Sequence, residues 1–108
     1  MGEGPRRNVM KVIRENEIEF LERLYNGMFS GDLYFDLWGY EHPTATLWEG
    51  IDEDVQTIHD NWEGKIAGWV AIARAHDFEV FIEVVSYDHY SYGECNDVYV
   101  ILKDVRVR

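Results

Sequence analysis

The run of residues 52–87 constrains the fold of this chain more than any other stretch. Its first part carries apolar residues at alternating intervals of three and four, the spacing that places side chains on one face of an α-helix. These residues are Val55, Ile58, Trp62, Ile66, Trp69 and Ala73. In residues 78–87 every second position is apolar, which is typical of a β-strand. We predict one long helix over residues 52–75, in which Gly64 and Gly68 allow close approach to a sheet, and then a strand.

The composition indicates a single folded domain. A chain of 108 residues can bury a hydrophobic core without disulfides, and 46% apolar and 15% aromatic residues argue against disorder. No apolar run reaches the roughly 18–20 residues that a membrane span needs. The basic residues 1–7 lead into no apolar segment of the kind a secretory signal contains. We therefore predict a disordered leader over residues 1–7, one α+β domain over residues 8–108, and a cytoplasmic location.

An earlier helix is predicted from a capping motif. Asn16 and Glu19 have the spacing of a capping box, in which the two side chains satisfy free backbone N–H groups at a helix start. Gly27 is a suitable stop, because glycine adopts the left-handed conformation at little cost. We predict this helix over residues 17–26.

The remaining apolar segments predict strands. Residues 33–38 and 44–48 read as the arms of a hairpin, and residues 97–107 as a last strand after residues 78–87. Residues 9–14 suit either a strand or the first turns of a helix. The expected fold is α+β, with a single, mostly antiparallel sheet of four to five strands packed on two helices. If residues 9–14 are a strand, the order βαββαβ plus one strand suits a ferredoxin-like arrangement.

The charge of the chain is strongly negative and unevenly distributed. Ten basic and 21 acidic residues give a net charge of −11. Between Leu24 and Leu102 there are fifteen acidic residues but only two basic ones, Lys65 and Arg74, for a net charge of −13. Such a body repels nucleic acid and anionic membranes and is attracted to basic surfaces. The alternative is that the charge serves only to keep the protein in solution.

Carboxylates are interleaved with aromatic residues in two stretches. In residues 32–41 the side chains of Tyr34, Asp36 and Trp38 are expected on one face of a strand. Residues 49–54 place several carboxylates at the start of the long helix, where they also stabilise the helix N-terminus. Carboxylates can stand in for phosphates and rings for bases, so these stretches predict a surface that binds a basic nucleic-acid-binding groove. The candidate partner-binding residues are Asp32, Tyr34, Asp36, Trp38, Glu41, Glu49, Asp52, Glu53 and Asp54.

A tyrosine-rich loop is predicted over residues 88–96. Tyrosine, serine, glycine and asparagine are typical of contact loops, which adds Asp88, Tyr90, Tyr92 and Glu94 to the candidate partner-binding residues. The same loop contains His89 and Cys95, which predict a small enzyme if the thiol lies beside the imidazole. Contact is the favoured interpretation, because no surrounding motif supports catalysis and the loop contains no basic residue to stabilise a thiolate. No catalytic residue, cofactor or metal site is therefore expected.

Two segments resemble a known family. Tyr25-Asn26-Gly27 with Gly31 and Asp36-Leu37, and then Trp48-Glu49-Gly50-Ile51, resemble the opening of DNA-mimicking antirestriction proteins of plasmids and transposons. The resemblance implies a non-enzymatic acidic inhibitor from a phage or mobile element, akin to small acidic anti-CRISPR proteins. Its partner would be a CRISPR effector or a restriction enzyme, whose basic nucleic-acid-binding surface it occludes. An immunity protein or antitoxin for a basic nuclease toxin is the alternative. Direct binding to nucleic acid or a membrane is not expected, and a homodimer stays open.

Overall fold

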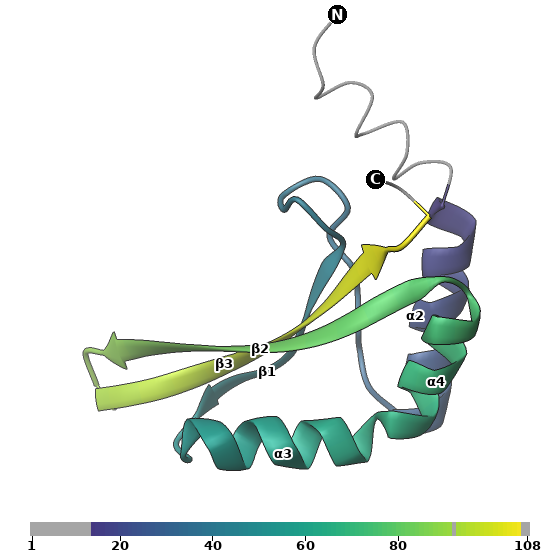
Figure 1. The fold of residues 1–108 in the computed structure, drawn as a ribbon. Coiled ribbons are helices and arrows are strands. Elements are labelled where there is room, and N and C mark those ends of the chain that lie inside the picture. Colours follow the sequence, from purple (N-terminus) through teal and green to yellow (C-terminus); the bar gives the residue numbers. More distant parts are fainter. Residues whose placement is uncertain (1–13, 92, 107–108) are drawn as a thin grey trace, which may run out of the picture.

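The computed structural model describes residues 14–91 and 93–106, which form three helices and a three-stranded sheet (Figure 1). In chain order the elements are α2 (Glu15–Phe29), β1 (Thr44–Ile51), α3 (Val55–Lys65), α4 (Ala67–Ala75), β2 (Phe78–His89) and β3 (Gly93–Asp104). The strand order is β1-β3-β2, and both pairs are antiparallel. The α+β class and the antiparallel sheet are therefore as predicted. Within the described ranges, no helix combines the length and apolarity needed to cross a membrane.

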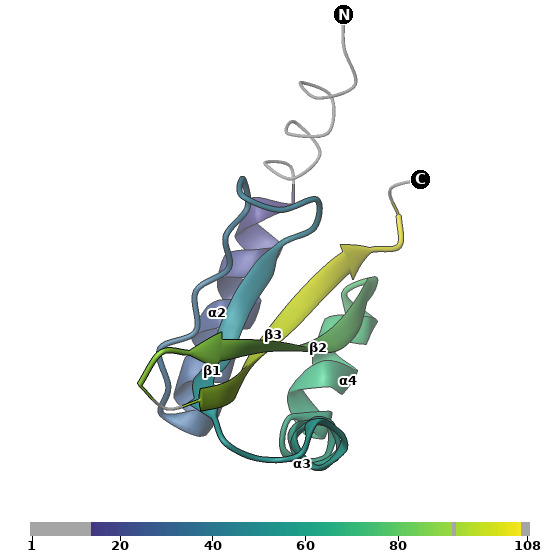
Figure 2. The same ribbon diagram turned by 90° about the vertical axis from the view of Figure 1, so that its left-hand side faces the viewer.

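The core lies between one face of the sheet and the helices. Figure 1 shows α3 running beneath the β2–β3 hairpin, with α4 and α2 beside the base of the hairpin. Figure 2 looks along the hairpin, with α2 at the left and α4 at the right. On β3 the alternate residues Val98, Val100 and Leu102 are fully buried. On β2, Phe78 is buried, and Val80, Ile82 and Val84 pack against the core, whereas Phe81 and Val85 are exposed on the other face. The predicted sidedness of both strands is confirmed.

The predicted long helix is two helices with a break at Ile66. The stripe of apolar residues continues across the break, so that Ile58, Trp62, Ile66, Trp69 and Ala73 are all buried. Only Val55, at the start of the stripe, is exposed. The break lies between Gly64 and Gly68, and glycine weakens a helix because it loses more backbone entropy than other residues.

The two glycines do not have the role that the sequence suggested. A Cβ atom on Gly64 would have no atom within 4 Å, and one on Gly68 would meet only Met28 of α2, at 3.9 Å. Neither glycine therefore allows close contact with the sheet. Their effect is on the continuity of the helix.

Helix α2 is longer at both ends than the predicted helix. It begins at Glu15, so Asn16 lies in its first turn and does not cap it. It passes through Gly27 and ends at Ser30, which takes the left-handed conformation with φ 54°. Asn26 instead holds the following segment, because its side chain accepts a hydrogen bond from the N–H of Leu33 (2.6 Å) and donates one to the carbonyl oxygen of Leu33 (3.0 Å).

The predicted strand over residues 33–38 is wrong, since only Asp36 pairs with another backbone, in a single bridge to Thr44. Side chains satisfy the backbone instead: Asn26 binds Leu33, and Glu22 accepts the N–H of Phe35 at 2.6 Å. The predicted sidedness persists, because Leu33 and Phe35 are buried and Leu37 packs against the core. The alternate residues Tyr34, Asp36 and Trp38 are exposed. The described part of the chain thus contains three strands, and a sheet of four to five strands with ferredoxin-like order is not confirmed. Residues 9–13 lie outside the described residues.

The predicted loop over residues 88–96 is mostly strand. β2 and β3 stay paired up to His89 and Gly93, so that Asp88 faces Glu94 across the hairpin and Tyr87 faces Cys95. The sequence misled here because serine, glycine and asparagine favour turns, whereas the paired backbone of a long hairpin overrides that preference.

Candidate functional site: an exposed acidic and aromatic surface

The twelve candidate partner-binding residues within the described ranges are all exposed. Tyr92, the thirteenth, lies outside them. The aromatic members are open to solvent to an unusual degree: Tyr90 is 98% exposed, Tyr34 70% and Trp38 57%. The structure places the candidates in three groups, which are the loop before β1, the corner between β1 and α3, and the tip of the β2–β3 hairpin.

The first group, residues 32–41, forms a loop whose acids have partly structural roles. Asp36 Oδ1 accepts the backbone N–H groups of Trp38 (2.9 Å) and Gly39 (2.8 Å), which closes a turn. The loop joins the first residue of β1, Thr44, whereas the second group begins at Glu49, near the other end of the strand. At about 3.3 Å per residue, the strand separates Thr44 from Glu49 by about 16 Å. The structure therefore does not merge the two acidic stretches into one site.

The second group, residues 49–54, forms a corner that is tied to β3. We call it the β1–α3 corner. Gly50, which has φ 68°, donates its N–H to Asp97 Oδ1 at 2.9 Å. Asn96 donates its side-chain N–H to the carbonyl oxygen of Glu53 at 2.8 Å. Asp54 caps α3 by accepting the N–H of Thr57 at 3.1 Å, as predicted for an acid at this helix start. The exposed carboxylates of the corner are thus carried on a fixed backbone.

A hollow of about 280 Å³ opens beside the β1–α3 corner. Its walls include the rings of Trp48 and Trp62, whose centroids are 6.4 Å apart and whose planes are inclined by 49°. Trp48 is 54% exposed, whereas Trp62 is 8% exposed and belongs to the core. The other lining residues are Ile51, Glu53, Ile58, Asn61 and Lys65. The Lys65 ammonium lies 4.5 Å from the centroid of the Trp62 ring.

Sequence reasoning missed a second set of polar residues next to the corner. Asp97 and Tyr99 alternate with the buried residues of β3, so they lie on the sheet face opposite the core, and Tyr99 donates its O–H to Asp97 Oδ2 at 3.4 Å. Partial burial, the charge of Asp97 and a hydrogen bond to it raise the pKa of Tyr87. Burial and the charge of Asp97 likewise raise the pKa of Tyr99. The alternation of apolar and polar residues in β3 was the sequence signal that could have identified Asp97 and Tyr99 as members of this outer face.

The third group is the hairpin tip. Asp88 and Glu94 are direct cross-strand neighbours, and like charges in that position repel each other. Tyr90 projects beyond them and stacks on His89, with ring centroids 4.8 Å apart. The tip therefore presents two carboxylates and one highly exposed ring at the end of the molecule.

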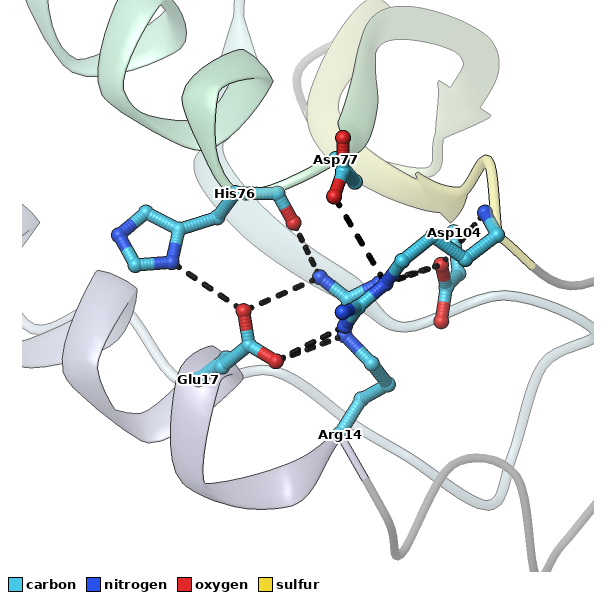
Figure 3. Close-up of polar contacts among 6 residues, drawn as sticks. Arg14, Glu17, His76, Asp77 and Asp104 are labelled. Carbon is cyan, nitrogen blue, oxygen red and sulfur yellow. Dashed lines mark hydrogen bonds and ion pairs between the residues drawn. The ribbon is translucent and has the colours of Figure 1, made fainter.

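The main group of ion pairs in the described part of the chain gathers where α2 begins and β3 ends, far from the hairpin tip (Figure 1 and Figure 3). Arg14 is buried, places Nε 3.1 Å from Glu17 Oε1, and also contacts Asp104 and the carbonyl oxygen of His76. Arg106 Nη2 lies 2.9 Å from Glu17 Oε1. Burial alone would raise the pKa of Glu17, but hydrogen bonds to His76 and Arg106 and the charges of Arg14 and Arg106 lower it. These contacts join the start of α2, the α4–β2 junction and the end of β3.

Eight acidic candidates, by contrast, take no part in these ion pairs. Among the described residues, the pairs use Glu17, Glu63, Asp77 and Asp104 as their acids. No ion pair of the described chain neutralises Asp32, Glu41, Glu49, Asp52, Glu53, Asp54, Asp88 or Glu94. Their charge is available to a partner.

The geometry does not favour the alternative of a small enzyme using His89 and Cys95. In the hairpin register His89 is opposite Gly93 and Cys95 is opposite Tyr87, a diagonal spacing of about 7–8 Å between strands. Cys95 is buried, whereas a reactive thiol has to be accessible. Burial of the Cys95 thiol, and not the strand register, is therefore the feature that disfavours nucleophilic catalysis here.

One side-chain cluster has donor atoms suited to a metal ion. Ligand atoms of His59, Asp60 and Glu63 on α3 lie within 4.8 Å of one another, and His59 Nδ1 is 3.7 Å from Glu63 Oε1. In the sequence the visible signal for this cluster is the i,i+4 spacing of His59 and Glu63, which places both on one face of a helix. The side chains are exposed or half-exposed, as on an ordinary acidic helix face.

Comparison with known proteins gives no information about the function of this surface. No protein-family model, no curated protein and no solved structure significantly matches the chain.

Proposed function

We propose that this chain is a non-enzymatic inhibitor that binds the basic nucleic-acid-binding surface of a bacterial defence complex and occludes it. The observation that carries the proposal is the set of eight exposed carboxylates that form no ion pair within the described ranges, presented beside exposed aromatic rings. A CRISPR effector or a restriction enzyme is the class of partner that the resemblance of the chain implies. The proposed role rests on competition for a surface and needs no cofactor.

Electrostatics supports this choice of partner. The net charge of −13 between Leu24 and Leu102 steers the protein toward basic surfaces and away from nucleic acid. Basic grooves that bind phosphates also accept carboxylates, and grooves that stack bases accept rings. Because these eight acids are exposed and form no ion pair with another described residue, binding breaks no ion pair of the described ranges.

The β1–α3 corner is the best-placed contact region. Backbone hydrogen bonds from Gly50 and to Glu53 fix it on β3, and Trp48 lies next to it. A surface that is ordered before binding loses less conformational entropy on association. The hairpin tip and the loop before β1 extend the acidic surface at either side of this region.

Affinity capture from a bacterial lysate tests the proposal. The tagged protein is expected to retain a nucleic-acid-handling protein at low salt, to release it as the salt concentration rises, and to compete with nucleic acid for it. Mass spectrometry identifies the captured protein, so that recovery of a nuclease toxin would favour the immunity-protein alternative. Capture that does not depend on salt, or no specific capture, would contradict the proposal.

Charge-reversed variants locate the surface. Replacing Glu49, Asp52 and Glu53 together with lysine is expected to weaken capture at least about tenfold. The control makes the same change in net charge with lysine at Glu19, Asp60 and Glu63, which are exposed on α2 and α3. Equal losses for both variants would mean that total charge, and not the β1–α3 corner, determines binding.

A further inference from the structure

We infer that the hollow between Trp48 and Trp62 is an anchor pocket for one large apolar side chain, carried on a lysine- and arginine-rich segment of the protein partner. The inference rests on the proposed function, since it names the part of the partner that the β1–α3 corner receives.

The size and walls of the hollow fit a side chain. Sites for small molecules usually enclose about 300–1,000 Å³, and the hollow, at about 280 Å³, lies just below that range. Two indole rings and the side chains of Ile51 and Ile58 make its lining largely apolar. Binding hot spots in protein interfaces are pockets of this kind, filled by one anchor residue and surrounded by polar contacts.

A bound partner would cover the exposed part of the Trp48 side chain. Slightly more than half of its surface is exposed, although the centroid of its ring lies only 6.4 Å from the centroid of the Trp62 ring. Covering an indole removes a large apolar area from water, which favours binding. Trp62 is held in the core, so it provides a fixed wall against which the anchor can pack.

The acidic residues around the opening of the hollow favour a positively charged segment. Glu53 lines the hollow, and Asp52 and Asp54 flank Glu53 in the chain, with no ion pair of the described residues to any of the three. Lys65 is the one cation in the lining, and it lies over the face of Trp62. The Trp62 ring therefore already makes a cation–π contact, and an arginine or lysine beside the anchor would use contacts of the same kind.

A second copy of this chain is a poorer occupant. Each copy carries a net charge of −11, so two copies repel each other. A basic segment, by contrast, is attracted to the negative charge of the corner. The occupant is therefore a segment of a basic partner.

Peptide binding followed by NMR tests the anchor pocket. The probe is the peptide arginine-lysine-leucine-arginine-lysine, and the matched control peptide has glycine in place of leucine. The chain contains four tryptophans, so its indole N–H signals report separately on Trp48 and Trp62, with Trp38 and Trp69 as internal references. At about 20 mM salt the leucine peptide is expected to shift the signals of Trp48 and Trp62 saturably, and the glycine peptide to bind about tenfold more weakly.

Variants separate the pocket from general charge attraction. Trp48→Ala is expected to weaken the leucine peptide about tenfold, to the level of the glycine peptide, and Trp48→Phe to restore most of the loss. Phe81→Ala removes a similarly exposed ring on the outer face of β2, outside the candidate residues, and is expected to leave peptide binding unchanged. Circular dichroism of each variant establishes that it is folded.

The outcomes also separate this inference from the proposed function. Equal binding of both peptides, shifts at Trp38 in place of Trp48, or no binding would each overturn the anchor pocket, while salt-dependent capture from the lysate would still support the inhibitor. Selective binding of the leucine peptide with no capture of a nucleic-acid-handling protein would instead support the pocket and contradict the proposed function.

Discussion

Asp97 on β3 accepts the backbone N–H of Gly50 at 2.9 Å and thereby fastens the end of β1 beyond the point where regular pairing stops. The register of β1 on β3 shifts twice, between Thr46 and Trp48 and again before Ile51. An irregular strand end of this kind would otherwise leave a backbone N–H without a partner. One carboxylate therefore supports both the β1–α3 corner and the tyrosines of the outer sheet face.

Asp97→Asn is expected to lower the pKa values of Tyr87 and Tyr99 toward 10.0, their ordinary value. The negative charge of Asp97 opposes formation of tyrosinate, so its removal makes deprotonation easier. NMR titration of protein labelled at the tyrosine Cζ measures both midpoints. Asp88→Asn, at the hairpin tip, is the control and should leave them unchanged. Unchanged midpoints in Asp97→Asn would contradict the assigned cause.

Alanine at Gly50 and at Gly64 should have opposite effects on stability. Gly50 has φ 68°, where an added Cβ is strained, so Gly50→Ala is expected to lower the free energy of unfolding by about 1–2 kcal/mol. Gly64 lies within α3 with open space around it, so Gly64→Ala should raise the free energy of unfolding by about 1 kcal/mol. Urea denaturation of both variants measures the difference. Destabilisation by Gly64→Ala would mean that the α3–α4 break depends on this glycine.

Arg14→Ala should destabilise the protein by about 3 kcal/mol, because it leaves the charge of Asp104 without its buried partner. The guanidinium also lies 3.8 Å from the centroid of the Phe78 ring, a contact that the variant loses. Thermal or urea unfolding gives the measurement. Arg74→Ala, at an exposed site on α4, should change stability by no more than about 0.5 kcal/mol. Similar values for the two variants would contradict a structural role of the network in Figure 3.

Glu17 should contribute to acid unfolding. Its pKa in the folded protein is below the ordinary value of 4.5, so ionised Glu17 stabilises the fold above that pH. This stability is lost as the pH falls below 4.5 through the folded-state pKa. Glu17→Gln is therefore expected to flatten the dependence of unfolding free energy on pH in this acidic window, with little change of slope near pH 7. Glu19→Gln, on exposed α2 surface, is the control, and an identical slope in wild type and Glu17→Gln would refute the role.

Local periodicity determined much of the secondary structure. The intervals of three and four in residues 52–75 identified a buried helical stripe, and the alternation in β2 and β3 identified the buried face of each strand. Such patterns are readable because side-chain direction repeats every 3.6 residues in a helix and every two in a strand. Even in residues 33–38 the alternation correctly predicted which side chains are buried and which are exposed, although the segment is not a strand.

Distant partners decided what the patterns left open. Residues 33–38 do not join the sheet because Asn26 and Glu22 of α2 bind their backbone, a competition that no local pattern records. The extension of the hairpin to His89 likewise depends on pairing between two strands.

Composition and charge made the acidic, exposed character of the candidate residues predictable, because carboxylates are rarely buried without a partner. Only the tertiary structure decided which of them lie together. The register of β1 on β3, with its two shifts, brings Gly50 to Asp97, and the packing of α3 brings Trp62 to Trp48. These contacts join residues far apart in the chain, and their geometry depends on strand register and helix packing, which are set by the fold as a whole.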